Sequence, residues 1–284
     1  MLAYQHVYHA GNFADVHKHL TLFATLEHIL RKESPVTYID THAGRGLYPL
    51  VAEETQKLQE YRQGVDLLWK HRASLQRSNP LLGDWLSCLA EVQASRESEL
   101  SHYPGSPWWL GRRLRRQDRL QLFELHPGEH QHLEAQSLPR NATRTYGDGL
   151  KGVVQILPAA TPRICVLIDP SYEQKAEYAR VADVVTSIAR KARHAQVLVW
   201  YPLLPAGRHR ELLERLLDSG LRKLWRSELS LRAPGDSQHG MYGSGMLIFN
   251  PSWGLDGLLG EALQPVVALL GREARYEADW WVPE

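Results

Sequence analysis

Residues 164–172, Ile-Cys-Val-Leu-Ile-Asp-Pro-Ser-Tyr, read as a buried strand that runs into a rigid polar turn. Five apolar residues in succession, without polar alternation, are typical of a strand at the centre of a parallel sheet covered on both faces. In such sheets ligands bind beyond the carboxyl ends of the strands. The stretch therefore predicts an α/β fold in which Asp169 stands at the mouth of a site.

The atoms of this turn indicate what the site binds. Pro170 fixes its own φ and biases Asp169 away from the helical region, so the Asp169 carboxylate and the Pro170 carbonyl can face the same way as acceptors. Two acceptors suit an amino group, and Tyr172 can offer a flat face for a base. We expect a pocket for an exocyclic amine on a planar ring. An ordinary strand end followed by a Pro-Ser turn is the alternative that four residues leave open.

The composition is ordinary for a folded α/β protein, either one domain or one domain with an insertion. Of 284 residues, 43% are apolar and 23% are charged, and the formal net charge of +1 creates no global positive field, so any nucleic-acid surface must be local. Two cysteines, Cys88 and Cys165, suggest reduced core thiols in a cytoplasmic protein. We see no signal peptide or membrane-spanning stretch and expect neither secretion nor membrane insertion.

Residues 36–48 contain a second strand and turn. A short β-rich run ends at Asp40 and leads to Gly44 and Gly46, after which we expect a helix. Glycines at such a turn let the backbone approach a nucleotide. The third glycine of the dinucleotide pattern is missing, which makes an NAD-dependent oxidoreductase the weaker interpretation, and a plain structural turn is an open alternative.

Two further strands place acids along the same edge. The run 120–124 ends at Glu124, where the carboxylate closing a second strand commonly accepts hydrogen bonds from ribose hydroxyls. The run 142–146 leads into Asp148 between two glycines. We therefore expect the side chains at 40, 124, 148 and 169 to form one row of acids.

The C-terminal part continues the alternation of helices and strands, with helices at 173–193 and 208–219, a strand at 196–201, and an antiparallel pair at 222–231 and 245–250. The last strand ends in Asn250-Pro251-Ser252-Trp253, which also fits an Asp/Asn-Pro-x-aromatic pattern. An antiparallel strand would carry this turn to the opposite edge of the sheet, so the pattern favours Asp169 as the functional turn.

The N-terminal segment is rich in histidine and precedes a helix that we expect to begin with Asp15 as N-cap and to run to about Lys32. Histidines 6, 9, 17 and 19 suggest a metal site, but two histidines two residues apart do not share a helix face. We expect no metal and interpret the segment as a polar substrate or cofactor surface.

Residues 51–93 predict two amphipathic helices separated by 78–80, which we interpret as part of an inserted helical subdomain. The expected division is 1–50 for the N-terminal motif, helix and first βα unit, 51–102 for the insertion, and 103–284 for the remaining domain. A rigid loop at 103–107 precedes the basic run Arg112–Arg116. These arginines would suit phosphates beside a base-binding site, or else form a solvated helix face.

Taken together, the motifs resemble the bacterial 23S ribosomal RNA adenine-N6 methyltransferases of the large-subunit type J family, formerly described as competence or external-DNA-catabolism proteins. The matching stretches are His-Ala-Gly-Asn-x-Ala-Asp-Val within 4–19, Asp-Thr-His-Ala-Gly at 40–44, Tyr-Pro-Gly-Ser-Pro at 103–107, Glu-Leu-His-Pro at 124–127, Asp-Pro-Ser-Tyr-Glu at 169–173 and Ser-Gly-Met at 244–246. The turn at 169–172 departs from the commoner Asp/Asn-Pro-Pro-Tyr/Phe at its third position.

The resemblance implies a Rossmann-like class I methyltransferase fold with a small helical insertion, S-adenosylmethionine as methyl donor, and an adenine of domain V of 23S ribosomal RNA as target. We expect the RNA to be protein-free or an early assembly intermediate, and the enzyme to be a cytoplasmic monomer without membrane contact. A DNA adenine-N6 methyltransferase would use the same pocket. A non-enzymatic nucleic-acid-binding protein linked to the use of external DNA is the alternative from another class.

Carried over position by position, the resemblance assigns roles to individual residues. It implies cofactor contacts, to which we add the glycines of the first turn, at His19, His42, Gly44, Gly46, Ser106, Glu124, Asp148, Gly149 and Asp169. It implies a substrate-responsive N-terminal motif that contains Tyr4 and Lys18. In the expected mechanism adenine leaves its stack and lies against Tyr172, while Asp169 and the Pro170 carbonyl accept the amino hydrogens.

Overall fold

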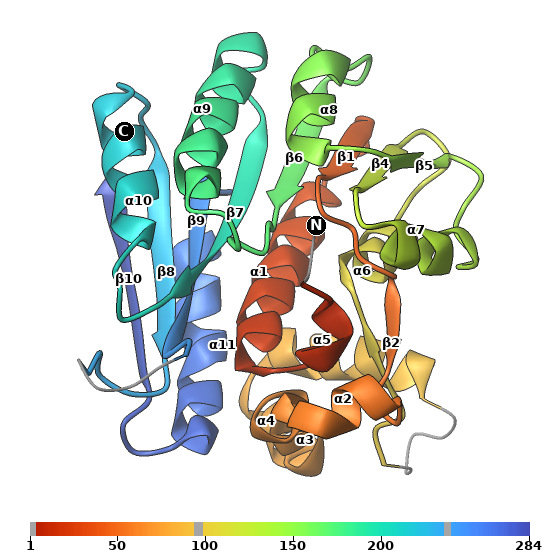
Figure 1. The fold of residues 1–284 in the computed structure, drawn as a ribbon, viewed down its shortest axis with the longest axis vertical. Coiled ribbons are helices and arrows are strands. Elements are labelled where there is room, and N and C mark those ends of the chain that lie inside the picture. Colours follow the sequence, from red (N-terminus) through yellow and green to blue (C-terminus); the bar gives the residue numbers. More distant parts are fainter. Residues whose placement is uncertain (1–3, 94–98, 236–239) are drawn as a thin grey trace.

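An eight-stranded sheet with strand order β10-β8-β9-β7-β6-β1-β4-β5 organises the computed structural model, which describes residues 4–93, 99–235 and 240–284 (Figure 1). The parallel part consists of β1 (Val36–Asp40), β4 (Arg119–Glu124), β5 (Ala142–Tyr146), β6 (Arg163–Ile168) and β7 (Gln196–Leu203). The remainder is antiparallel and consists of β8 (Leu224–Ser230), β9 (Gly243–Phe249) and β10 (Arg275–Val282). The expected α/β fold is confirmed.

Strand β6 lies between two parallel neighbours, and its alternate side chains enter two different cores. Ile164, Val166 and Ile168 pack in the core on one face. Cys165 and Leu167 pack in the core on the other face. This two-sided burial is why the sequence of β6 is a continuous apolar run rather than an alternating one.

Helices cover both faces of the sheet (Figure 1). One face carries α1 (Phe13–Ile29), α6 (Ser106–Arg112) and α11 (Leu255–Leu270). The other carries α8 (Gly149–Ile156), α9 (Ala176–Lys191) and α10 (His209–Asp218), while α7 (Pro127–Glu134) lies beside β4 and β5. No helix within the described ranges is long and apolar enough to cross a bilayer.

Helix α1 begins one turn earlier than expected and ends earlier too. Its N-cap is Asn12, whose side-chain oxygen accepts a hydrogen bond from the Asp15 amide at 2.9 Å, so the prediction of Asp15 as the cap was wrong. Asp15 lies inside the first turn, where its carboxylate accepts from the Gly11 amide at 2.8 Å. A cap and a first-turn acid have similar sequence patterns, and only the tertiary partners of Asp15 distinguish them.

The sequence predicts a helix directly after the glycine turn, but the chain there forms the first of two short paired strands. β2 (Leu47–Pro49) pairs antiparallel with β3 (His102–Pro104). The helix that packs on β1 and β4 is α6, which begins only at Ser106. The insertion therefore interrupts the first βα unit between its strand and its helix.

The described residues between these two strands form a run of short helices, α2 (Glu53–Leu58), η2 (Glu60–Gln63), α3 (Val65–Lys70), α4 (Arg72–Ser78) and α5 (Pro80–Leu89). The single helix expected around 58–69 is wrong, because Gln59 adopts a left-handed conformation with φ 52°. The second helix and the break before it are confirmed, since Asn79 caps α5 by accepting from the Leu82 amide at 3.1 Å.

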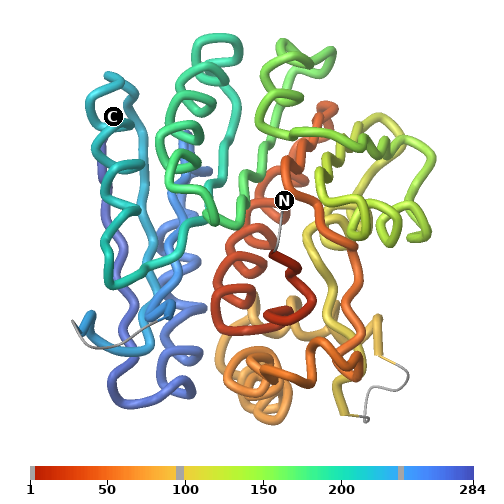
Figure 2. Tube along the Cα trace, viewed as in Figure 1, coloured from red at the N-terminus to blue at the C-terminus, as the bar shows by residue number. Residues whose placement is uncertain are grey.

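Gly64 of the insertion lies directly against the N-terminal segment. A Cβ at Gly64 would lie 2.3 Å from the Gly11 carbonyl oxygen, so only glycine allows this approach. The two segments lie side by side in the chain trace (Figure 2), and the Val65 amide donates to the same carbonyl at 2.8 Å. The inserted helices thus support the segment that leads into α1.

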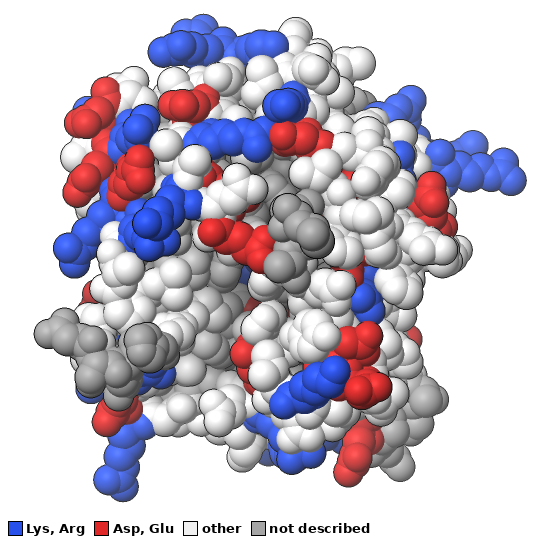
Figure 3. All heavy atoms as spheres, in the orientation of Figure 1, with Lys and Arg blue, Asp and Glu red and all other residues white. Residues whose placement is uncertain are grey.

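The arginine run at the end of α6 lies away from the row of acids. Arg112 pairs with Glu91, Arg113 with Glu27 and Arg115 with Asp118. Each of the three has an acidic partner, and Arg115 packs near the amino end of β1, so their positions give no support to the alternative in which this run binds phosphates beside the site. On the face shown in Figure 3, acidic and basic side chains are interspersed.

Candidate active site

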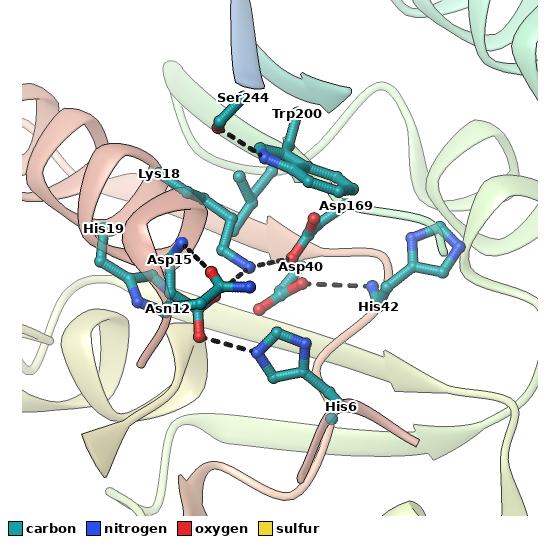
Figure 4. Close-up of polar contacts among 12 residues, drawn as sticks. His6, Asn12, Asp15, Lys18, His19, Asp40, His42, Asp169, Trp200 and Ser244 are labelled. Atoms are coloured by element: carbon teal, nitrogen blue, oxygen red, sulfur yellow. Dashed lines mark hydrogen bonds and ion pairs between the residues drawn. The ribbon is translucent and has the colours of Figure 1, made fainter. Parts of the chain in front are cut away.

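The carboxyl ends of the parallel strands, together with the N-terminal segment and α1, enclose a cavity of about 480 Å³. Most of the residues expected at a site line it, namely Tyr4, Lys18, His19, His42, Gly44, Ser106, Glu124, Asp148, Gly149, Asp169 and Pro170. Asp40 is fully buried and lies between Asp169 and His42 (Figure 4). The predicted row of acids therefore exists along one edge of the sheet.

Asp169 accepts an N–H hydrogen bond from a buried ammonium group. Its Oδ2 lies 2.6 Å from Lys18 Nζ, and the same Nζ lies 2.9 Å from Asp15 Oδ1 (Figure 4). Burial raises the pKa of Asp169, although Lys18 opposes this shift. Burial also opposes the charge on Lys18, but Asp15 and Asp169 together raise its pKa above the ordinary value. The carboxylate is thus already oriented to receive a nitrogen donor.

A hydrogen-bond network links the histidine-rich segment to this ion pair. Tyr4 Oη lies 2.8 Å from His6 Nδ1, and His6 Nε2 lies 2.9 Å from Asp15 Oδ2. Burial alone would raise the pKa of Asp15, but His6 and Lys18 hold it well below its ordinary value. Sequence reasoning placed His6 in a polar substrate or cofactor surface, but only the folded geometry pairs it with Asp15.

Glu124 anchors the glycine turn from the neighbouring strand. Its carboxylate accepts from the Gly44 amide at 2.7 Å and from the His126 amide at 2.7 Å. Burial raises the pKa of Glu124 in spite of these two hydrogen bonds. A carboxylate oxygen that accepts one backbone N–H still has a lone pair for a ligand hydroxyl.

Two glycines that line the cavity pack closely against neighbouring parts of the chain. A Cβ at Gly149 would lie 2.0 Å from the Thr41 carbonyl oxygen, and a Cβ at Gly44 would lie 2.2 Å from the Tyr48 hydroxyl. Next to Gly149, Asp148 caps α8 by accepting from the Lys151 amide at 3.2 Å, and it pairs with Arg180. Backbone surfaces of this kind allow a nucleotide-like ligand to approach closely.

Burial shifts the pKa values of two side chains near Gly44, His42 and Asp40. Burial lowers the pKa of His42 to about 4, so its imidazole is neutral at physiological pH. Burial raises the pKa of Asp40 to about 7. Asp40 Oδ1 accepts from the His42 amide at 3.2 Å, whereas Oδ2 has no hydrogen-bond partner within the part of the chain that the structure describes.

Gly46 does not line the cavity, although the sequence predicted it there. Its φ of +82° explains the requirement for glycine, and its carbonyl accepts from the Gly105 amide at 2.8 Å. Gly46 thus joins the first turn to the start of α6, and the prediction of a direct ligand contact is not supported by its position.

Tyr172 faces the core rather than the cavity, which corrects its predicted role as the base-stacking ring. The ring is 6% exposed and stacks on Tyr178 with centroids 4.3 Å apart. Its hydroxyl donates to the Trp200 carbonyl at 2.8 Å. A left-handed φ of 54° at Tyr172 turns the chain after Ser171, a feature that the residue types alone did not indicate.

Trp200 is the aromatic side chain that lines the cavity beside Asp169 (Figure 4). Sequence reasoning missed it because it lies within a predicted buried strand. The signal was a tryptophan at the carboxyl half of an apolar run, in a strand adjacent to the functional turn. No group of three or more potential metal ligands occurs among residues 4–93, 99–235 and 240–284.

Comparisons with known proteins agree with one another. Residues 33–282 match the model of the family described as "Ribosomal RNA large subunit methyltransferase D, RlmJ". Two proteins named "Ribosomal RNA large subunit methyltransferase J", from Haemophilus influenzae and Escherichia coli, are 34% and 32% identical, with 100% of each chain covered. A crystal structure from Legionella pneumophila is similar with a TM-score of 0.87 and 32% identity, covering 96% of this chain and 98% of that one.

Proposed function

The chain belongs to the family "Ribosomal RNA large subunit methyltransferase D, RlmJ", and from this premise we propose that it methylates N6 of an adenine in 23S ribosomal RNA. It is an S-adenosylmethionine-dependent ribosomal RNA methyltransferase with an α/β fold. The observation that carries the choice of an amino group is the Asp169-Pro170 corner, where a buried carboxylate accepts a nitrogen donor at 2.6 Å.

The cavity fits S-adenosylmethionine on the evidence of its backbone surfaces. Gly44 and Gly149 line the cavity with backbone atoms alone, and Glu124 offers acceptors to ribose hydroxyls. When bound, S-adenosylmethionine supplies an electrophilic methyl group on a sulfonium. We propose that it would be held by residues from the strand ends, the start of α6 and α1, namely His19, His42, Gly44, Ser106, Glu124, Asp148, Gly149 and Asp169.

The proposed chemistry begins with the release of Asp169 from Lys18. Asp15 retains the Lys18 ammonium at 2.9 Å, so Asp169 can exchange this partner for the adenine amino group without leaving the ammonium unpaired. Asp169 and the Pro170 carbonyl then accept the two amino hydrogens and direct the nitrogen lone pair toward the methyl carbon. When the amino group accepts a methyl group it would lose a proton, and the raised pKa of Asp169 would suit this carboxylate to receive that proton.

The remaining details are proposals of the same kind. We propose that the enzyme acts as a monomer. We propose that it acts in the cytoplasm on 23S RNA that is protein-free or early in assembly. We also retain the division into 1–50, 51–102 and 103–284, with the β2–β3 pair at the base of the insertion.

Methyl-acceptor assays test the proposal. Protein-free 23S RNA from cells that lack the enzyme, assembled large subunits and duplex DNA would each be incubated with labelled S-adenosylmethionine. We expect stoichiometric transfer to the RNA and little transfer to the other two. Transfer to duplex DNA alone would support the DNA methyltransferase alternative. No transfer together with no calorimetric binding of S-adenosylhomocysteine would support the non-enzymatic alternative.

A further inference from the structure

We propose that Trp200 is the aromatic face on which the target adenine stacks, and that the chain Ser244–His17–Ser227 fixes its indole. The inference rests on the proposed function and deepens it. It starts from two observations, since Tyr172 is packed in the core and Trp200 lines the cavity beside Asp169. Base stacking on an aromatic side chain is the usual way in which proteins hold an unpaired base.

The sheet register places Trp200 level with the catalytic corner. Ile168 of β6 is paired with Val199 of β7, so the next residues, Asp169 and Trp200, stand side by side where β6 has ended and β7 continues to Leu203. Such strands lie about 4.8 Å apart. The indole and the carboxylate thus form two adjacent walls of one corner.

The position of Lys18 Nζ shows where a nitrogen donor to Asp169 lies relative to the Asp169 carboxylate and the Trp200 indole. Its Nζ lies 2.6 Å from Asp169 Oδ2 and 5.8 Å from the centroid of the Trp200 ring (Figure 4). An exocyclic amine that takes the place of this ammonium at Asp169 brings its attached ring beside the indole face. The same position therefore satisfies the amino group and the base plane together.

A directional hydrogen-bond chain holds the indole. Trp200 Nε1, which can only donate, lies 3.0 Å from Ser244 Oγ, and Ser244 Oγ lies 3.0 Å from His17 Nδ1. Because Ser244 accepts from the indole, its hydroxyl hydrogen is free to donate to Nδ1, which leaves Nε2 to donate to Ser227 Oγ at 2.9 Å. Ser227 in turn donates to the Tyr276 hydroxyl at 3.2 Å.

Each link of this chain is buried and uncharged. His17, Ser227 and Ser244 have 0% exposure. Burial lowers the pKa of His17 to about 3, so the imidazole keeps one accepting and one donating nitrogen at physiological pH. Buried polar groups are costly unless every partner is satisfied, and a fully satisfied chain rigidifies what it holds.

The Ser-Gly-Met stretch at 244–246 is explained by the same arrangement. A Cβ at Gly245 would lie 2.1 Å from the ring of Tyr201, the residue after Trp200. Glycine at 245 therefore leaves room for the Tyr201 ring opposite it, in the same strand pair in which Ser244 bonds the indole. The stretch supports the stacking residue although it contributes no atom to the lining of the cavity.

Steady-state kinetics with protein-free 23S RNA, combined with calorimetry of S-adenosylhomocysteine, test the inference. Trp200→Leu is expected to lower kcat/KM for RNA by about 10- to 100-fold, because stacking on one aromatic ring contributes that much to base binding. Its affinity for S-adenosylhomocysteine is expected to stay within about twofold. Trp200→Phe keeps a flat face and is expected to retain kcat/KM within about fivefold.

Ser244→Ala tests the positioning chain separately. It leaves the indole in place but removes its partner, and we expect KM for RNA to rise about 3- to 10-fold with unchanged affinity for S-adenosylhomocysteine. Tyr276→Phe is the matched control, since it alters the end of the chain farthest from the cavity, and we expect KM within about twofold. An unchanged KM in Ser244→Ala would overturn the positioning role.

Other outcomes separate failure of this inference from failure of the proposed function. If the wild-type enzyme transfers no methyl group to RNA, the proposed function fails first. If the wild type is active and Trp200→Leu keeps kcat/KM within twofold, or Trp200→Phe is as impaired as Trp200→Leu, the stacking role is overturned. Should Trp200→Leu fail to fold, Trp200→Phe and Ser244→Ala still decide the matter.

Discussion

Two turns with the same pattern, Asp169-Pro170-Ser171-Tyr172 and Asn250-Pro251-Ser252-Trp253, lie at opposite edges of one sheet. The first follows β6, which is parallel to both neighbours. The second follows β9, which is antiparallel to both of its neighbours. Since antiparallel strands end at opposite edges, only the first turn reaches the cavity. Strand direction, which four residues cannot encode, decides which copy of the pattern is functional.

The side chains of the two turns have correspondingly different partners. Asp169 faces the cavity, and its partner is the exchangeable ammonium of Lys18. Asn250 has a left-handed φ of 52°, and its amide nitrogen donates to the carbonyls of Arg193 at 2.7 Å and Ala195 at 3.0 Å. The Asp169 side chain lies at the cavity, and the Asn250 side chain holds the loop that contains Arg193 and Ala195.

The largest difference between the turns is expected in the rate of methyl transfer. Asp169→Ala removes one of the two acceptors for the amino group, and we expect kcat to fall by at least about 100-fold, as when one preorganised polar group is removed from a transition-state site. Calorimetry should show nearly unchanged binding of S-adenosylhomocysteine. Asn250→Ala is the matched control and should retain kcat within about twofold. A fully active Asp169→Ala enzyme would contradict the functional difference between the two turns.

The acids at the two edges of the sheet are expected to respond oppositely to pH. At the cavity edge, burial raises the pKa of Asp40 to about 7. At the other edge, burial would also raise the pKa of Asp118, but hydrogen bonds from Arg115 and Val36 outweigh it and lower that pKa. A raised carboxyl pKa means that the neutral form is favoured in the folded state. The associated stability is complete below the unfolded pKa near 4 and is lost as pH rises through 7.

Asp40→Asn removes this ionisation and keeps an acceptor for the His42 amide. Relative to the wild type, the variant should gain about 3 kcal/mol more stability at pH 8 than at pH 5, since each unit of pKa shift corresponds to about 1.4 kcal/mol. Urea unfolding at the two pH values measures the difference. A stability difference that does not change with pH would contradict the assignment.

A smaller effect is expected at Asn250 itself, and it concerns stability alone. Asn250→Ala loses two hydrogen bonds and places alanine at a left-handed φ, so we expect a loss of about 1–2 kcal/mol in the free energy of unfolding. Asn250→Gly tolerates that φ but still loses the hydrogen bonds, and it should lose less. If urea unfolding gave the same free energy for the wild type, Asn250→Ala and Asn250→Gly, the hydrogen bonds of Asn250 would not stabilise the fold.

The aromatic ends of the two turns differ in burial, and the smallest effect of all is expected at Trp253. Trp253 is 92% exposed, so Trp253→Ala should change stability by less than about 0.5 kcal/mol and leave methyl transfer unchanged. Tyr172, at 6% exposed, should behave as a core residue, with Tyr172→Ala costing about 3 kcal/mol or more. Thermal unfolding of the two variants compares them, and a large loss in Trp253→Ala would contradict this contrast.

The strands at the site could be predicted because their signals are local. Residues 142–146 were predicted without error in either bound, and Glu124, Asp148 and Asp169 line the predicted edge because apolar runs that stop at acids mark the ends of parallel strands. The rival turn at Asn250 was also assigned to the correct edge. For β6, burial on both faces left a continuous apolar pattern, whereas the partly exposed edge strand β5 was marked by the glycine turn that follows it.

The failures share a different cause, which is dependence on tertiary contacts. The choice of Asn12 over Asp15 as helix cap follows from the ion pair of Asp15, and the direction of Tyr172 follows from one backbone angle. The edge strand β10 was not predicted because its sequence reads as polar and aromatic without a clear boundary. Trp200 was missed because its importance lies in its neighbours, Asp169 and Ser244.

The central claim is that the corner at the carboxyl end of β6 binds an amino group. The most direct test is to identify the methylated nucleoside by mass spectrometry after the enzyme has acted on protein-free 23S RNA. A corner built from the Asp169 carboxylate and the Pro170 carbonyl accepts amino hydrogens, so the account predicts N6-methyladenosine. A methyl group on a ring carbon of adenine, on a ribose 2′-oxygen or on a base without an amino group would contradict it.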